Sequence, residues 1–215
     1  HDGNAWVANK AQVYGNAEVW GNARIWGEVE VYGNAQVYGN AEVFDNVKIS
    51  GEAEVYDNAT VWDEVKIYDT VQVSGNAEVG DSAVVWGNAR IFGNARVAGN
   101  AKIWDRAELY GDAIVWGNAQ LYDSAKVSGD VELYGSAQVC GNALVSKNGD
   151  ILVFKNHWSS GRHFTYTKSN KMWKVGCFYG TGQELIQKAY QDSKTSGDHY
   201  KYYVDFVEGL ERLYK

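Results

Sequence analysis

The sequence contains no proline and only two cysteines. Cys140 and Cys177 are too few for a disulfide framework and lack the CxxC spacing of a metal site, so we expect two buried or half-buried thiols and a cytoplasmic protein. No run of about 18 apolar residues is present, which predicts that no helix spans a membrane. The chain starts at His1 without an initiator methionine or a signal peptide, and we expect a fragment that begins inside a repeat.

Histidine is also scarce: the chain has four, and none lies between residues 2 and 156. The formal net charge of −7 is distributed unevenly, because residues 1–150 hold 10 Lys and Arg against 21 Asp and Glu, whereas residues 151–215 hold 10 against 6. Opposite charges predict two modules, 1–150 and 151–215. The acidic character of the first argues against nucleic-acid binding along it.

What the sequence does contain is a six-residue repeat. Every sixth residue from Val7 to Ile151 is Val, Ile or Leu; from Val7 to Val145, Ala or Val stands two residues earlier and Gly or Asp two earlier again, with Asn9 the exception. Side chains alternate along a strand, so the Ala and the aliphatic residue face the same way, while the polar residue between them faces outward. Gly, Asn and Asp favour turns. The 24 units therefore predict short parallel strands, separated by corners and stacked into a solenoid.

The unit (G/D)-N-A-x-(V/I/L)-aromatic, as in GNAEVW and GNARIW, resembles the hexapeptide-repeat left-handed parallel β-helix proteins over about residues 3–151. The resemblance implies three hexapeptides per coil, and hence about eight triangular coils. Acyltransferases of that family carry loops that interrupt the repeat and a histidine general base, and its carbonic anhydrases carry a histidine-ligated zinc. The unbroken, histidine-free repeat here is more similar to non-enzymatic repeat proteins of phages and gut bacteria.

The residue after each aliphatic position is aromatic in most units, and residues 18 apart should stack in three columns on the solenoid edges. One interpretation is that the rings stack on one another and stabilise the corners. The other is a recognition surface for carbohydrate or a protein partner, and Gly80 and Ala98 could mark a dent in it. The candidate ligand residues are Trp26, Trp62, Trp86, Trp104 and Trp116. Asparagine in 13 of the 24 corners predicts hydrogen-bonded ladders.

The second module has no repeat and predicts a small α+β unit. Residues 151–156, 163–167 and 172–178 have the pattern of strands. Thr181 and Glu184 form a capping-box signature that opens a helix, the chain should break around 193–197, and a last helix is expected over 198–213. Such a unit would cap an open solenoid end, whose unpaired strand edges would otherwise aggregate.

This second module also contains a candidate site for an anionic ligand, made of Arg162, Lys174 and the helix start at Thr181. A nucleophile–base set of His157, His163 and Cys177 lacks an orienting pattern. We expect no catalytic residue, metal ligand or cofactor. The leading hypothesis is a non-catalytic structural or interaction scaffold with a protein partner or self-association, such as a homotrimer, and no membrane contact. The alternatives are a binding module for carbohydrate or a small anion and, third, an acyltransferase-like enzyme.

Overall fold

The computed structural model describes residues 3–213. The chain forms two compact units: the first ends at Asn148 and the second begins at Gly149.

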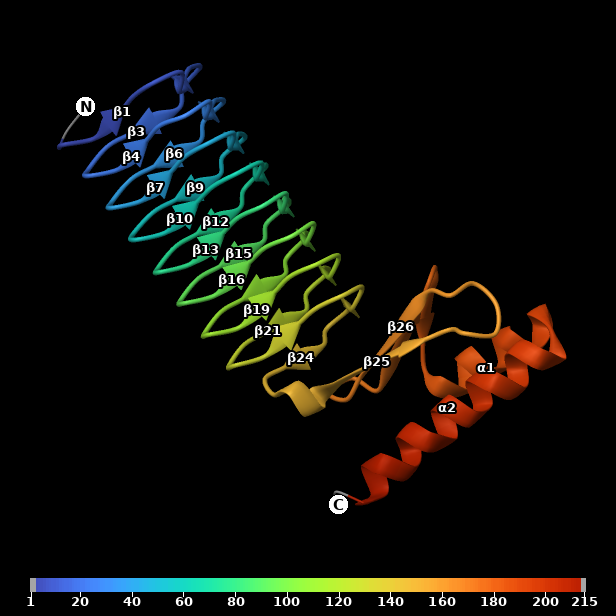
Figure 1. Ribbon diagram of the computed structural model, residues 1–215. Helices are drawn as coiled ribbons and strands as arrows, with labels where there is room; N and C mark the ends of the chain where they lie inside the picture. The colour runs from blue at the N-terminus through green and yellow to red at the C-terminus, as the bar shows by residue number, and fades with distance from the viewer. Residues whose placement is uncertain (1–2, 214–215) are drawn as a thin grey trace. The chain divides into compact units, whose positions relative to one another are not determined.

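The first unit is a parallel β-solenoid of 24 two-residue strands in three sheets (Figure 1). One sheet contains β1 (Trp6–Val7), β4 (Arg24–Ile25), β7 (Glu42–Val43), β10 (Thr60–Val61), β13 (Glu78–Val79), β16 (Arg96–Val97), β19 (Ile114–Val115) and β22 (Glu132–Leu133). The second contains β2 (Gln12–Val13), β5 (Glu30–Val31), β8 (Lys48–Ile49), β11 (Lys66–Ile67), β14 (Val84–Val85), β17 (Lys102–Ile103), β20 (Gln120–Leu121) and β23 (Gln138–Val139). The third contains β3 (Glu18–Val19), β6 (Gln36–Val37), β9 (Glu54–Val55), β12 (Gln72–Val73), β15 (Arg90–Ile91), β18 (Glu108–Leu109), β21 (Lys126–Val127) and β24 (Leu144–Val145).

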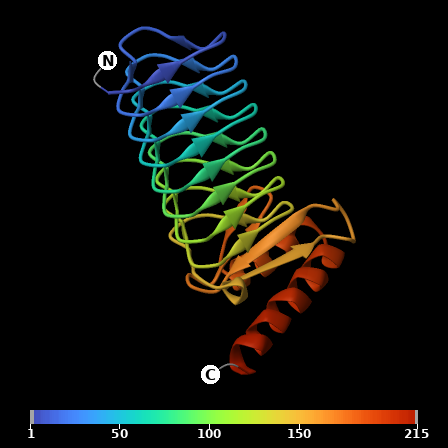
Figure 2. The same cartoon turned by 60° about the vertical axis from the view of Figure 1, so that its left-hand side comes forward.

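Each strand pairs in parallel with the strand one coil further along, as Val7 does with Ile25 and Ile67 with Val85. The coil therefore contains 18 residues and three sides, and Figure 2 shows the strands of one side stacked from the blue to the yellow end. The predicted solenoid of about eight three-sided coils is confirmed. The left hand of the coil stays a prediction.

The inward register is also as predicted. From Val19 to Val145, every Ala, Val, Ile or Leu at the two inward positions is at most 3% exposed. Burying one Val contributes about 1.5–3 kcal/mol, so the three aliphatic residues of each coil are a large part of its stability. The first coil is the exception, since Val7 is 39% exposed and has a neighbouring strand on one side only.

The corners use the left-handed backbone conformation. Glycine stands at most of them with positive φ, and seven aspartates take its place at φ 57–67°. Five of these aspartates compensate for the strain, because the carboxylate accepts a hydrogen bond from a backbone N–H one coil further on, as Asp57 does from Gly75 and Asp81 from Gly99. Where glycine remains, backbones approach closely: a Cβ on Gly51 would lie 2.7 Å from the nitrogen and oxygen of Asp69.

A 3₁₀ turn, η1 (Asn148–Asp150), spans the boundary between the units, and the second unit continues with an antiparallel sheet in the order β25-β26-β27-β28. Its strands are β25 (Ile151–Lys155), β26 (His163–Thr167), β27 (Met172–Val175) and β28 (Phe178–Gly180), followed by α1 (Gly182–Asp192) and α2 (Lys194–Leu213). The predicted α+β class is confirmed. The predicted strand 172–178 was wrong in extent, because a turn at Gly176, with φ 55°, divides it into β27 and β28.

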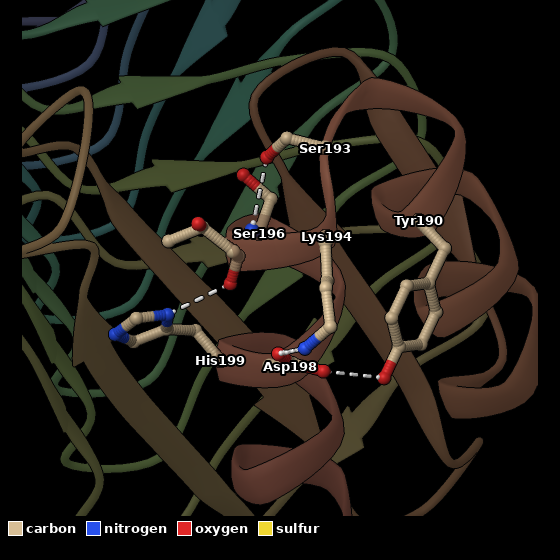
Figure 3. A network of polar contacts seen from close by, with 7 residues as sticks. Tyr190, Ser193, Lys194, Ser196, Asp198 and His199 are labelled. Carbon is tan, nitrogen blue, oxygen red and sulfur yellow. Dashed lines mark hydrogen bonds and ion pairs between the residues drawn. The ribbon is translucent and has the colours of Figure 1, made fainter.

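The break expected at 193–197 is present but was predicted too long, since only Ser193 lies between the two helices. Figure 3 shows why the second helix starts early: the Ser193 hydroxyl accepts from the backbone N–H of Ser196 at 3.0 Å and caps it. The ring of Tyr190 lies on Gly197, where a Cβ would meet it at 2.2 Å, and its hydroxyl donates to Asp198. Gly197 is therefore a helix–helix contact and does not end the helix. No helix within residues 3–213 is long and apolar enough to cross a membrane.

Candidate functional site

The aromatic columns of the solenoid are ladders of stacked rings. In the pairs with interplanar angles of 7° or less, ring centroids lie 4.2–5.2 Å apart, which matches the spacing of the coils. These pairs are Tyr14–Tyr32, Trp20–Tyr38, Trp26–Phe44, Tyr38–Tyr56, Trp86–Trp104, Phe92–Tyr110 and Trp104–Tyr122.

Stacking covers the ring faces against which a bound sugar would pack. Trp104 is covered on both faces, by Trp86 at 4.9 Å and by Tyr122 at 4.2 Å. Trp26 lies between Phe44 at 4.6 Å and the tilted ring of Trp6 at 6.3 Å. Each stacked pair adds about 0.5–1.5 kcal/mol. In these positions the geometry favours the structural interpretation of the columns, because mainly ring edges face solvent.

Trp62 and Trp116 are different, since both border the interruption at Gly80 and Ala98. The indole of Trp62 lies against Gly80, where a Cβ would be 2.3–2.7 Å from three of its ring atoms, and Gly80 is buried. Trp116 contacts Tyr134 in a tilted pair at 5.9 Å and is 47% exposed. The structure therefore separates the five predicted tryptophans into ladder members and a pair that borders a gap.

The asparagine corners form the predicted ladder on one edge. Each side-chain amide donates to the next coil at 2.8–3.1 Å. The ladder consists of Asn22, Asn40, Asn58, Asn76, Asn94 and Asp112. On the sheet faces, ion pairs join neighbouring coils, as in Lys48–Glu30 at 2.8 Å and Arg96–Glu78 at 3.2 Å. Their exposure limits each to about 0–1 kcal/mol.

In the second unit, Thr181 lines a cavity of about 310 Å³ together with Tyr166, Lys171 and Glu211. The Tyr166 hydroxyl donates to Glu211, and burial together with this carboxylate raises the pKa of Tyr166. Thr181 is occupied as the predicted helix cap: its hydroxyl accepts from the backbone N–H of Glu184, whose carboxylate accepts from the Thr181 N–H at 2.8 Å. The hydrogen bonds that the backbone N–H and the hydroxyl of Thr181 donate to the Glu184 carboxylate hold the pKa of Glu184 below its usual value.

The three residues predicted to bind an anion are not brought together. Strand pairing places Thr181 just after Gly180, opposite Trp173, whereas Arg162 precedes β26 at the other end of the sheet, near Gly176. Lys174 lies between these ends and pairs with Thr165 and Tyr179. Strand β28, which the sequence pattern did not reveal, separates the glycine-rich turn from the helix start.

Two histidines, His157 and His199, form a small aromatic group with Trp158. His199 stacks on Trp158 at 4.5 Å, and His157 lies 5.7 Å from His199. Within residues 3–213, no three His, Cys, Asp or Glu side chains are placed to hold a metal ion. Neither cysteine forms a disulfide; Cys140 is buried, but Cys177 is exposed, so the expectation of a buried or half-buried thiol was wrong there, because Cys177 lies in the turn before β28.

One surface was missed from the sequence: a shallow apolar groove of about 300 Å³ lined by Phe154, Tyr202, Tyr203 and Phe206. Tyr202 is 74% exposed and Phe206 54%. The signal was present, because these two residues are spaced i, i+4 on α2, outside the face formed by Val204 and Val207, which are buried.

The fold and these sites define a parallel β-solenoid repeat protein with a C-terminal α+β unit. A family model described as the YdcK Beta solenoid repeat matches residues 89–102 and 137–149, two stretches that both lie in the solenoid. Over these stretches the chain is similar to that repeat. No curated protein matches the chain.

Proposed function

We propose that this protein is a non-catalytic structural or interaction scaffold. The observation that carries the proposal is the filled interior of the solenoid, in which the inward positions from Val19 to Val145 are at most 3% exposed. All of these inward side chains pack in the core. On the outside, many side chains contact one another in the stacked rings, the ion pairs and the asparagine ladder. The unbroken repeat supports placing the chain with hexapeptide-repeat proteins, such as those of phages and gut bacteria, that carry no catalytic histidine.

The proposed partner is a protein. The partner that we favour is a second and third copy of this chain, which together would form a homotrimer. Support comes from exposed aromatic surface in the second unit, where Tyr202 and Phe206 border an apolar groove. Exposed apolar surface of this kind is typical of contact sites. A cytoplasmic location agrees with two cysteines that form no disulfide.

Sedimentation equilibrium over a wide concentration range tests self-association, and a Phe206→Glu variant tests the groove. We expect a reversible oligomer that Phe206→Glu weakens, with Tyr134→Glu, an equally exposed change on the solenoid, as the control. A monomer at all concentrations would contradict self-association.

Thermal unfolding with acetyl-CoA at millimolar concentration tests the enzyme alternative. A ligand that binds the native state raises the melting temperature by mass action. We expect no shift; a saturable shift would contradict the non-catalytic assignment.

A further inference from the structure

The aromatic column of the sheet that contains β16 is interrupted once. Four successive coils present Trp62, Gly80, Ala98 and Trp116 at the position after the strand. The indole of Trp62 stacks on Phe44 at 6.3 Å and extends over Gly80, whereas Ala98 contributes only a methyl group. The ring of Trp116 contacts Tyr134 on one side, and 47% of the residue is exposed.

The coil of Ala98 carries no ring in this column. Coils are about 4.8 Å apart, so two coil steps, about 10 Å, separate the level of Gly80 from that of Trp116. Elsewhere on the solenoid, parallel rings stack one step apart, with centroids at 4.2–5.2 Å. A flat ring at the level of Ala98 would therefore lie one coil step from Trp116, and residue 98 does not supply it.

Polar groups border this interval on both sides. Arg96 lies two residues before Ala98 and faces outward like it, in a 3.2 Å ion pair with Glu78 of the previous coil. Both side chains keep much of their surface in solvent, 59% and 41%. On the corner side stands Asn100, whose side-chain amide makes no hydrogen bond to any residue in 3–213, in contrast to Asn94 in the ladder.

We propose that the interruption at Ala98 binds one pyranose ring of a neutral glycan, between Trp62 and Trp116, with the sugar hydroxyls on Arg96, Glu78 and Asn100. A pyranose has apolar C–H faces that fit against indole faces and a rim of hydroxyls that donate and accept hydrogen bonds. Small-molecule sites combine aromatic walls with a few placed polar groups in this way. An aromatic side chain of a protein partner could also lie in this interval, but its ring would offer no hydrogen-bonding groups to Arg96, Glu78 and Asn100. This site goes beyond the scaffold role and does not depend on it.

The test is calorimetric titration of the full chain with four neutral hexasaccharides, made of β-1,4-glucose, α-1,4-glucose, β-1,4-mannose and β-1,4-N-acetylglucosamine. We expect saturable, millimolar-range binding of at least one of them. Ala98→Tyr should abolish binding, because the new ring fills the interval, while the melting temperature stays the same or rises. Ser128→Tyr is the matched control, since Ser128 holds the same position after β21 and lies half-buried beyond the ring of Tyr110; it should leave binding unchanged.

Trp116→Ala provides a second test that does not depend on fitting a larger side chain. Trp116 is exposed, so its loss should leave the fold intact and reduce affinity at least tenfold. Absence of saturable binding to all four glycans would overturn the proposal. Binding that survives Ala98→Tyr or Trp116→Ala in a folded protein would overturn it equally, because the sugar would then bind elsewhere.

Discussion

The two units of this chain obtain their stability in different ways. In the solenoid, each residue contacts its equivalent 18 positions away, and the core consists of the same few small and branched side chains throughout. The second unit has a single aromatic core, which includes Phe164, Trp173 and Tyr200, and its contacts join distant positions, as in the hydrogen bond from Asn156 to Tyr200. The comparison shows that repetition distributes stability over many equal interfaces, whereas the small unit depends on a few large side chains.

The largest effect is expected from Val85→Asp in the middle of the solenoid. Val85 is fully buried, and an unpaired carboxylate there should cost at least about 4 kcal/mol and unfold neighbouring coils together. Urea unfolding followed by circular dichroism measures the loss. Val84→Asp is the matched control, because Val84 faces outward between Lys66 and Lys102, and it should change stability by less than about 1 kcal/mol. Equal effects of the two variants would contradict the inward register.

Trp173→Ala should destabilise the second unit alone. Trp173 is 2% exposed in the aromatic core, and its removal should cost about 3–5 kcal/mol. Hydrogen exchange resolved by peptide should show faster exchange in residues 149–213 and unchanged protection in the coils. Leu213→Ala, at a residue 78% exposed and outside the apolar groove, is the control and should change neither. Loss of protection throughout the solenoid would contradict the separation of the two units.

A pair of glycine substitutions separates backbone strain from crowding between coils. Gly51 and Gly135 both have positive φ, but a Cβ on Gly51 would lie 2.7 Å from Asp69, whereas one on Gly135 would meet nothing within 4 Å. Gly135→Ala should cost about 1–2 kcal/mol from strain, and Gly51→Ala about 1–3 kcal/mol more from the clash. Thermal unfolding of both variants checks this. If the two variants have the same melting temperature, the close approach of neighbouring backbones does not restrict which residues the corners accept.

The smallest effect concerns pH and one ladder tyrosine. Burial, reinforced by Glu54, raises the pKa of Tyr38 from its usual value of 10 to about 12. The folded state therefore holds this proton more tightly, so its stabilising contribution is complete below pH 10 and is lost as pH rises from 10 to 12. Tyr38→Phe should remove that part of the decline in unfolding free energy measured in urea. Tyr134→Phe, at an exposed ring, should leave the decline in place; identical slopes for Tyr38→Phe and the unchanged chain would contradict the assignment.

The difference between the solenoid and the second unit also explains which features could be predicted from the sequence. In the solenoid, each residue's neighbours follow from a fixed period, so the strands, the inward register, the aromatic stacks and the asparagine ladder could all be predicted. The contact of Trp62 with Gly80 could not be predicted, because it depends on a side-chain orientation that the repeat period does not determine.

In the second unit, local patterns predicted the Thr181 capping box and the sheet's first two strands. They could not predict that Gly176 divides a strand or that Gly197 lies inside a helix, because these depend on Tyr190 and on strand pairing across the sheet. The separation of Arg162 from Thr181 has the same origin. Sites assembled from distant segments need the tertiary structure, whereas those on one column of the solenoid do not.

Removal of one whole coil tests most directly whether the solenoid is a stack of equivalent 18-residue turns. Deletion of residues 51–68 joins Ser50 to Asp69 and restores every column, so we expect the same circular dichroism spectrum and cooperative unfolding with slightly lower stability. Deletion of residues 51–59 removes half a coil and two corners, and it should lower the melting temperature strongly. If the whole-coil deletion were as damaging as the half-coil deletion, the coils of the solenoid would not be interchangeable units that contact only their nearest neighbours.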